Sequence, residues 1–80
     1  MELLETPNPN AKKINIQHDK IVGEYINKQD LVQDSFELRI LNLPEIDSIF
    51  VGPNFYTILK KANADWESIS RDINTILDKI

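Results

Sequence analysis

The sequence IDSIFVGPNFYTILK, at residues 46–60, carries the clearest structural signal in the chain. Two β-rich segments, residues 46–51 and 55–60, flank Gly52-Pro53-Asn54, which has the composition of a tight turn. The second segment alternates apolar and polar residues, which is the period of a strand with one buried face. We therefore expect a β-hairpin with a three-residue loop.

A helix is predicted directly after this hairpin, from about residue 65 to the end of the chain. Either Asn63 or Asp65 can cap it, and acidic residues near its start suit the helix dipole. Its apolar residues recur at helical spacing and form one stripe: Trp66, Ile69, Ile73, Ile76, Leu77 and Ile80.

A second helix is predicted before the hairpin, starting at Asp34. Asp34 as N-cap with Glu37 three residues later fits a capping box in outline. Pro44 ends the helix, because the residue before a proline is disfavoured in the α region. The apolar residues of this segment share one helical face: Phe36, Ile40, Leu41 and Leu43.

The N-terminal third reads as extended segments and loops. Residues 6–10, Thr-Pro-Asn-Pro-Asn, predict a stiff polar loop, because each proline fixes its own φ and restrains the residue before it. Residues 13–16 alternate as a strand, residues 17–20 read as a turn, and residues 21–26 are β-rich and could pair beside the previous strand. Gly23 weakens that strand or marks a bulge, and residues 27–33 give no clear signal.

These elements predict a two-layer α+β sandwich in a single domain, residues 1–80. The order is β-hairpin, helix, β-hairpin, helix, with a small mixed or antiparallel sheet and both helices on one face.

The composition of the chain argues against several classes of function. The chain has no cysteine and one histidine, His18, so thiolate-held zinc or iron–sulfur sites cannot form within it, and we expect no metal and no cofactor. A net charge of -4 argues against nucleic acid, and two glycines cannot assemble a phosphate-binding loop. No apolar run approaches the length needed to span a membrane, and the opening residues Met-Glu-Leu-Leu-Glu lack the basic region typical of a signal peptide. We expect a cytoplasmic (bacterial) or mature mitochondrial-type protein.

Catalytic interpretations are weak. His18-Asp19 reads as a solvated turn, and a single histidine could serve a hydroxyl nucleophile only by accident. The carboxylate pairs Glu45/Asp47 and Asp65/Glu67 could in principle act as acid and base, but capping and solvation account for them. We expect no enzyme activity.

Two motifs resemble a known family. Thr6-Pro7-Asn8-Pro9-Asn10, followed by a β segment, and Phe50-Val51-Gly52-Pro53-Asn54-Phe55, followed by a Trp66-led helix, are similar to the N-terminal domain of Nfu-type (NifU-like) iron–sulfur scaffold proteins. Nearly the whole chain takes part. It departs from the family pattern at Lys12, Asp34-Ser35 and Pro44-Glu45.

The resemblance implies an α+β module that accompanies a separate cluster-binding domain with a Cys-x-x-Cys pair. The expected function is therefore a non-catalytic protein-interaction module in iron–sulfur cluster assembly or delivery. Its expected partners are a Cys-x-x-Cys cluster-binding domain or apoprotein clients. The alternative is a free-standing small regulatory protein unrelated to clusters.

The candidate partner-binding residues lie in the two motifs. A proline-locked loop loses little entropy on binding, and an exposed aromatic beside it would favour a protein-binding patch. The alternative for the loop is a structural connection whose Asn side chains cap backbone groups. Phe50, Phe55, Tyr56 and Trp66 are expected mainly in the core, with Phe55 and Tyr56 on opposite faces. The candidates are Thr6, Pro7, Asn8, Pro9, Asn10, Lys12, Phe50, Gly52, Asn54 and Phe55.

Overall fold

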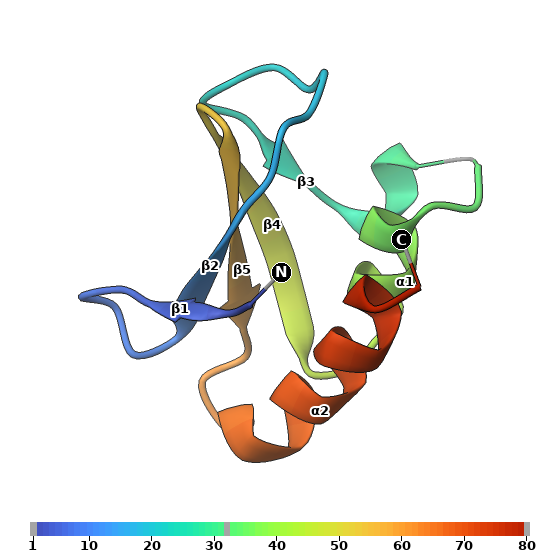
Figure 1. The fold of residues 1–80 in the computed structure, drawn as a ribbon. Coiled ribbons are helices and arrows are strands. Elements are labelled where there is room, and N and C mark those ends of the chain that lie inside the picture. Colours follow the sequence, from blue (N-terminus) through green and yellow to red (C-terminus); the bar gives the residue numbers. More distant parts are fainter. Residues whose placement is uncertain (1, 32, 80) are drawn as a thin grey trace.

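The computed structural model describes residues 2–31 and 33–79. These residues form one five-stranded antiparallel sheet, in the order β1-β2-β5-β4-β3, with two α-helices (Figure 1). The strands are β1 (Leu4–Glu5), β2 (Ala11–Asn15), β3 (Tyr25–Ile26), β4 (Ile46–Gly52) and β5 (Phe55–Lys60). The helices are α1 (Phe36–Leu41) and α2 (Trp66–Leu77), with a 3-10 turn, η1 (Lys28–Asp30), between β3 and α1.

The hairpin predicted at residues 46–60 is confirmed as β4 and β5. Its loop is one residue shorter than expected, because Gly52 pairs with Phe55 and only Pro53 and Asn54 remain outside the ladder. Asn54 adopts φ 61°, and a type II turn requires such a positive φ at its second central residue, with proline common at the first. Asparagine tolerates this left-handed conformation better than most residues.

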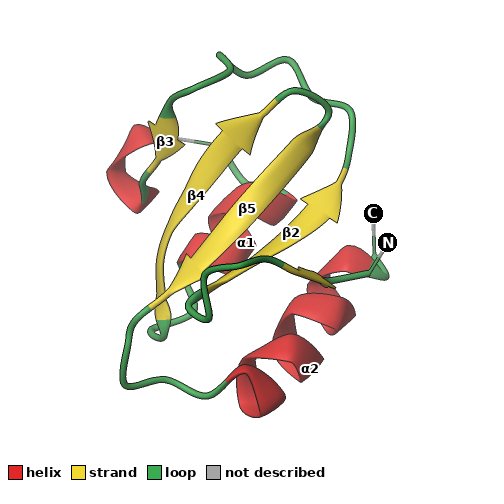
Figure 2. Cartoon of the chain, turned by 90° about the vertical axis from the view of Figure 1, so that its left-hand side faces the viewer, coloured by secondary structure: helices red, strands yellow, loops and turns green. Residues whose placement is uncertain are grey.

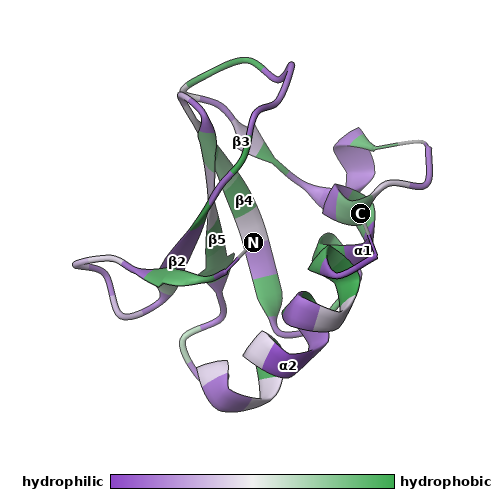
Figure 3. Ribbon diagram, viewed as in Figure 1, coloured by the Kyte–Doolittle hydropathy of each residue, from purple (hydrophilic) through white to green (hydrophobic). Residues whose placement is uncertain are grey.

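The strands divide their side chains between two faces. Figure 2 shows one face of the sheet with both helices behind it, and Figure 3 shows apolar and polar residues following one another along β4. The helix-covered face holds the core, and the other, which we call the open face, carries no helix from the described residues. The buried core comprises Ile14, Ile26, Ile40, Leu41, Ile46, Ile49, Val51, Tyr56, Ile58, Ile69, Ile73 and Leu77.

The first hairpin differs from the prediction. Residues 6–10 connect β1 to β2, so the strand partner of β2 on this side is Leu4–Glu5, a pair too short to show a period. The predicted pairing of residues 21–26 beside the previous strand is wrong, because β3 pairs with β4 instead. Only Tyr25–Ile26 is a strand, and Gly23 at φ 94° belongs to a turn before it.

Helix α1 starts one residue later than predicted. Ser35 is the N-cap, and its hydroxyl accepts the Leu38 N–H at 3.2 Å, so the predicted capping role of Asp34 is wrong. Asp34 instead pairs with Arg39 at 2.8 Å, and the hydrogen bond from Arg39 lowers the pKa of the Asp34 carboxyl. The helix ends at Leu41, before the predicted stop at Pro44.

Helix α2 follows the prediction closely. The Asp65 side chain caps it by accepting the Glu67 N–H, and three residues of the predicted stripe, Ile69, Ile73 and Leu77, are buried. Ile80 of that stripe lies outside the described residues. The α+β class with two helices on one face of the sheet is thus confirmed.

Candidate functional site

Polar side chains of the loop at residues 6–10 form hydrogen bonds within the loop and with the start of β2. The Thr6 hydroxyl accepts the Asn8 N–H at 3.2 Å and lies 2.9 Å from the carbonyl oxygen of Ala11. The Asn8 side chain accepts the Asn10 N–H at 2.9 Å. These contacts match the structural interpretation of the Thr-Pro-Asn-Pro-Asn motif, in which short polar side chains replace missing backbone partners.

The loop is also fastened to the body of the domain on two sides. The Trp66 indole N–H donates to the Pro9 carbonyl at 2.9 Å, and the Lys12 ammonium lies 5.5 Å from the centre of the Trp66 ring. From β5, the Lys60 ammonium donates to the Asn10 side chain at 3.0 Å. A loop restrained in this way has little conformational entropy left to lose on binding.

A groove lies on the open face between this loop and the far edge of the sheet. Tyr25 and Phe50 form one wall, with their rings in an edge-to-face pair at 5.1 Å between centroids. The register places Phe50 and Tyr25 opposite each other and Thr57 next to Phe50, so the row continues across three strands. The groove has a volume of about 340 Å³, and all its lining residues are uncharged: Thr6, Pro7, Asn8, Ala11, Tyr25, Phe50, Thr57 and Leu59.

The predicted site residues do not all meet in this groove. Four of them line it: Thr6, Pro7, Asn8 and Phe50. Pro9 and Lys12 border an adjoining recess with Trp66, which shares four lining residues with the groove. Lys12 pairs with Ile58 and therefore lies on the helix-covered side of the sheet.

The remaining candidates belong to other parts of the fold. Gly52, Asn54 and Phe55 lie at the β4–β5 turn, where the Phe55 ring folds directly over Gly52 and the Lys13 ammonium lies 5.5 Å from its centre. The side-chain oxygen of Asn10 accepts a hydrogen bond from Lys60, in strand β5.

Sequence reasoning missed four lining residues of the groove: Ala11, Tyr25, Thr57 and Leu59. The alternation of β5 places Thr57 and Leu59 on the face of Phe55, so those two were accessible from the pattern. Tyr25 reaches the groove only because β3 pairs with β4, and no local signal encodes that pairing.

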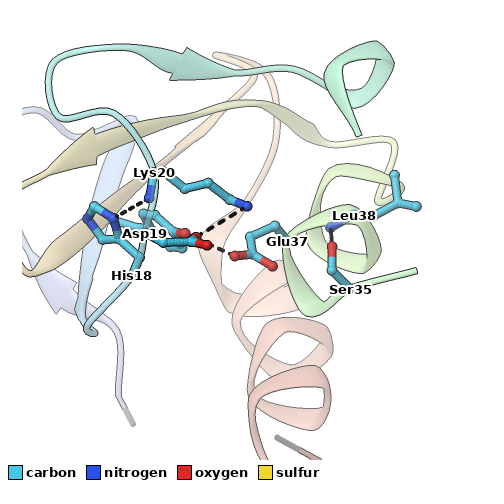
Figure 4. A network of polar contacts seen from close by, with 7 residues as sticks. His18, Asp19, Lys20, Ser35, Glu37 and Leu38 are labelled. Atoms are coloured by element: carbon cyan, nitrogen blue, oxygen red, sulfur yellow. Dashed lines mark hydrogen bonds and ion pairs between the residues drawn. The ribbon is translucent and has the colours of Figure 1, made fainter. Parts of the chain in front are cut away.

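A buried polar network joins α1 to the sheet on the covered side. The Tyr56 hydroxyl donates to the Glu37 carboxylate at 2.9 Å, and both side chains are buried. In Figure 4, Glu37 points from α1 toward the loop that carries His18, Asp19 and Lys20. Burial, and then the hydrogen bond to Glu37, raise the pKa of Tyr56 well above its ordinary value.

His18 packs against Tyr56, and both nitrogens of its ring contact backbone groups. Its ring stacks on Tyr56 at 4.9 Å between centroids. Nδ1 accepts the Lys20 N–H at 3.1 Å, which leaves the ring proton on Nε2, 2.7 Å from the Gly52 carbonyl oxygen. The expectation of a solvated turn is wrong for this residue, because both ring nitrogens are engaged by backbone groups.

Metal and membrane features can be stated only for the described part of the chain. Within residues 2–31 and 33–79, no three His, Cys, Asp or Glu side chains come together in a way that could hold a metal ion. Across the same residues, no helix is long and apolar enough to cross a membrane.

The fold and the groove define a small α+β domain with a two-helix layer, an open sheet face and a rigid Pro-Asn loop beside it. The chain matches the family described as "Scaffold protein Nfu/NifU N terminal" over residues 1–80. It therefore belongs to the Nfu/NifU N-terminal domain family, which is associated with iron–sulfur cluster scaffolding.

Individual relatives agree with this placement. The chain is 37% identical over 79 residues to Conserved virulence factor C of Staphylococcus aureus, covering 91% of this chain and 21% of that protein. The crystal structure of a Staphylococcus aureus protein superposes with a TM-score of 0.77 at 27% identity, covering 96% of this chain and 99% of the other. A NifU-like protein from Saccharomyces cerevisiae gives 0.74 at 30% identity, covering 98% and 74%. The chain thus spans about a fifth of the length of the virulence factor.

Proposed function

We propose that this domain is a non-catalytic interaction module in iron–sulfur cluster assembly or delivery. In this role it docks, through the groove on the open face, onto a protein that carries the cluster on its own cysteines. The family match supports the pathway, and the absence of cysteine from the sequence means that thiolate ligands come from another domain or protein.

The choice of the groove as the docking site rests on one observation. In a chain with 28% charged residues, all eight residues that line the groove are uncharged. Five of them belong to strands and share the open face of the sheet, and the other three belong to the loop beside it. Depletion of charge at the centre and enrichment in aromatic residues are typical of protein–protein interfaces. The walls are already ordered: the loop is fixed by its hydrogen bonds, and Tyr25 packs on Phe50.

Amide-shift mapping tests this function. The isotope-labelled domain is titrated first with the Cys-x-x-Cys domain of an Nfu-type scaffold protein and then with an apoprotein client. We expect shifts at residues 6, 8, 25, 50, 57 and 59. Replacing the exposed Tyr25 by alanine should weaken binding about tenfold, as removal of an aromatic anchor typically does. Asn74→Ala, on the exposed side of α2, is the matched control and should bind like the unmodified chain.

Two outcomes separate the alternatives. Binding without shifts in the groove would retain the function and reject the site. Failure to bind any cluster-carrying or client protein, together with recovery of a specific partner outside cluster assembly, would support the regulatory alternative instead.

A further inference from the structure

A second surface lies beyond Tyr25, around the turn that precedes β3. In the described part of the chain, three large hydrophobic side chains stand mostly in solvent, and all belong to this turn and to β3: Ile21 is 67% exposed, Val22 55% and Tyr25 56%. Each Å² of apolar surface left in water costs the folded state about 25 cal/mol of free energy relative to burial. An ordered cluster of them marks a contact surface.

The backbone holds these side chains outward. Gly23 adopts φ 94°, a conformation that few other residues take, and thereby reverses the chain between Val22 and Glu24. The turn is tied to the edge of β4 on both sides: the Gly23 N–H donates to the Val51 carbonyl at 2.8 Å, and the Val51 N–H donates to the Glu24 carbonyl at 2.9 Å. The exposed apolar side chains therefore sit on a fixed frame.

A cleft of about 400 Å³ opens under this turn. Its apolar lining comes from the turn, β3, the residue after η1, and β4: Ile21, Tyr25, Ile26, Leu31 and Val51. Ile26 and Val51 belong to the buried core, and Leu31 packs against it. The floor of the cleft is therefore part of the rigid interior.

The charged groups at the same cleft are mostly acidic. Asp19, Glu24 and Asp30 contribute three carboxylates against the single ammonium of Lys20, which already lies 3.7 Å from Asp19. Lys28, although it belongs to η1, lines a different recess beside Leu43. With three negative groups and one positive group, the cleft has a net charge of about -2 at neutral pH.

We propose that this cleft docks a basic segment of a partner protein, with one lysine or arginine side chain inserted between Glu24 and Leu31. Such side chains combine a methylene stem, which can lie along an apolar floor, with a cation that remains at the rim. Glu24 and Asp30 supply the carboxylates for that cation, and the ring of Tyr25 adds a face for a cation–π contact. The neighbouring Ile21 and Val22 cover apolar residues on either side of the inserted cation.

This surface is separate from the groove of the proposed function, although Tyr25 borders both. The groove is uncharged and should show little dependence on salt. The cleft is acidic, and its exposed ion pairs should be screened progressively as salt rises. The two sites can therefore be distinguished on the same chain by their salt dependence and by residues other than Tyr25, such as Glu24 at the cleft and Thr57 in the groove.

The probe is a short capped peptide of alternating leucine and lysine, titrated into the isotope-labelled 80-residue chain. We expect amide shifts concentrated at residues 19–31 and a weaker affinity as the salt concentration rises. The same peptide with glutamine in place of lysine should bind at least fivefold more weakly. Because exposed ion pairs contribute modestly, Glu24→Gln alone should weaken binding about two- to fivefold, and the double variant with Asp30→Asn about tenfold.

Asp72→Asn, on the exposed side of α2, removes one carboxylate away from the cleft and should leave the affinity unchanged. Three results would overturn the proposal: an equal loss in Asp72→Asn, shifts spread evenly over the acidic surface, or equal binding of the glutamine peptide. A variant in which Ile21 and Val22 are both replaced by serine should bind the lysine peptide several-fold more weakly. Unchanged binding in that variant would reduce the site to non-specific charge attraction and would also overturn the proposal.

Discussion

Replacing Tyr56 by phenylalanine removes one oxygen from the centre of the buried network. The ring keeps its stacking on His18, and the hydrogen bond to the Glu37 carboxylate, 2.9 Å long, is lost. Glu37 is only 8% exposed, so water cannot readily take the place of the hydroxyl. Hydrogen bonds to charged groups contribute about 1.5–3 kcal/mol, and we expect the free energy of unfolding to fall by about 2 kcal/mol.

That loss is large for a domain of this size, whose total stability is on the order of 4–12 kcal/mol. Urea denaturation followed by circular dichroism measures it, with an unchanged slope showing that the folded state keeps its compactness. Tyr25→Phe, the same chemical change at an exposed position, is the matched control and should cost less than about 0.5 kcal/mol.

A double variant separates a stranded carboxylate from a general packing defect. If Tyr56→Phe is costly because Glu37 is left without a partner, then adding Glu37→Leu should recover part of the loss. The two changes would then be coupled rather than additive. A Tyr56→Phe chain as stable as Tyr25→Phe, or strictly additive costs, would refute this reasoning about the network.

The remaining predictions concern pH, the hairpin turn and the loop anchor. The folded chain raises the pKa of Tyr56 and so retains the phenol proton, whereas an unfolded phenol releases it near pH 10. The contribution of Tyr56 to the free energy of unfolding is therefore fully present below about pH 10 and is lost as the pH rises above it. In a Tyr25→Phe background, phenolate absorbance should appear together with unfolding, and a phenolate formed in a still-folded chain would contradict this. Asn54→Ala should cost about 1–2 kcal/mol of unfolding free energy because of the positive φ, whereas Asn54→Gly should be tolerated; equal costs in denaturation experiments would reject the strain argument. Trp66→Phe removes the hydrogen bond to Pro9 and should cost about 1 kcal/mol and increase hydrogen exchange in residues 6–10; unchanged exchange would show that the anchor is unnecessary.

The elements with strong local patterns were predictable from sequence. The hairpin of residues 46–60 combines alternation with turn residues, and α2 combines a cap with an apolar stripe, so both formed where expected. The cap of α1 was misplaced by one residue because Asp34 and Ser35 are both good N-caps. Only the tertiary structure shows that Ser35 reaches the Leu38 N–H while Asp34 binds Arg39.

Residues 21–26 show why pairing was harder to predict than the elements themselves. Their β-rich composition predicts a strand, but Gly23 turns the chain and leaves only Tyr25–Ile26 to pair, and the partner is β4 rather than β2. The groove depends on that non-local pairing, because it brings Tyr25 beside Phe50. The Thr-Pro-Asn-Pro-Asn motif alone predicts the part of the groove that the loop forms. The aromatic wall of Tyr25 and Phe50 can be placed only once the register of the sheet is known.

Calorimetric titration of a cluster-carrying, cysteine-bearing partner with the unmodified domain, Tyr25→Ala and Asn74→Ala provides the most direct test of the docking groove. The groove predicts measurable binding by the unmodified domain, an unchanged dissociation constant for Asn74→Ala, and a loss of about 1.4 kcal/mol, equivalent to tenfold, for Tyr25→Ala. Three indistinguishable dissociation constants would mean that the partner contacts some other face of the domain.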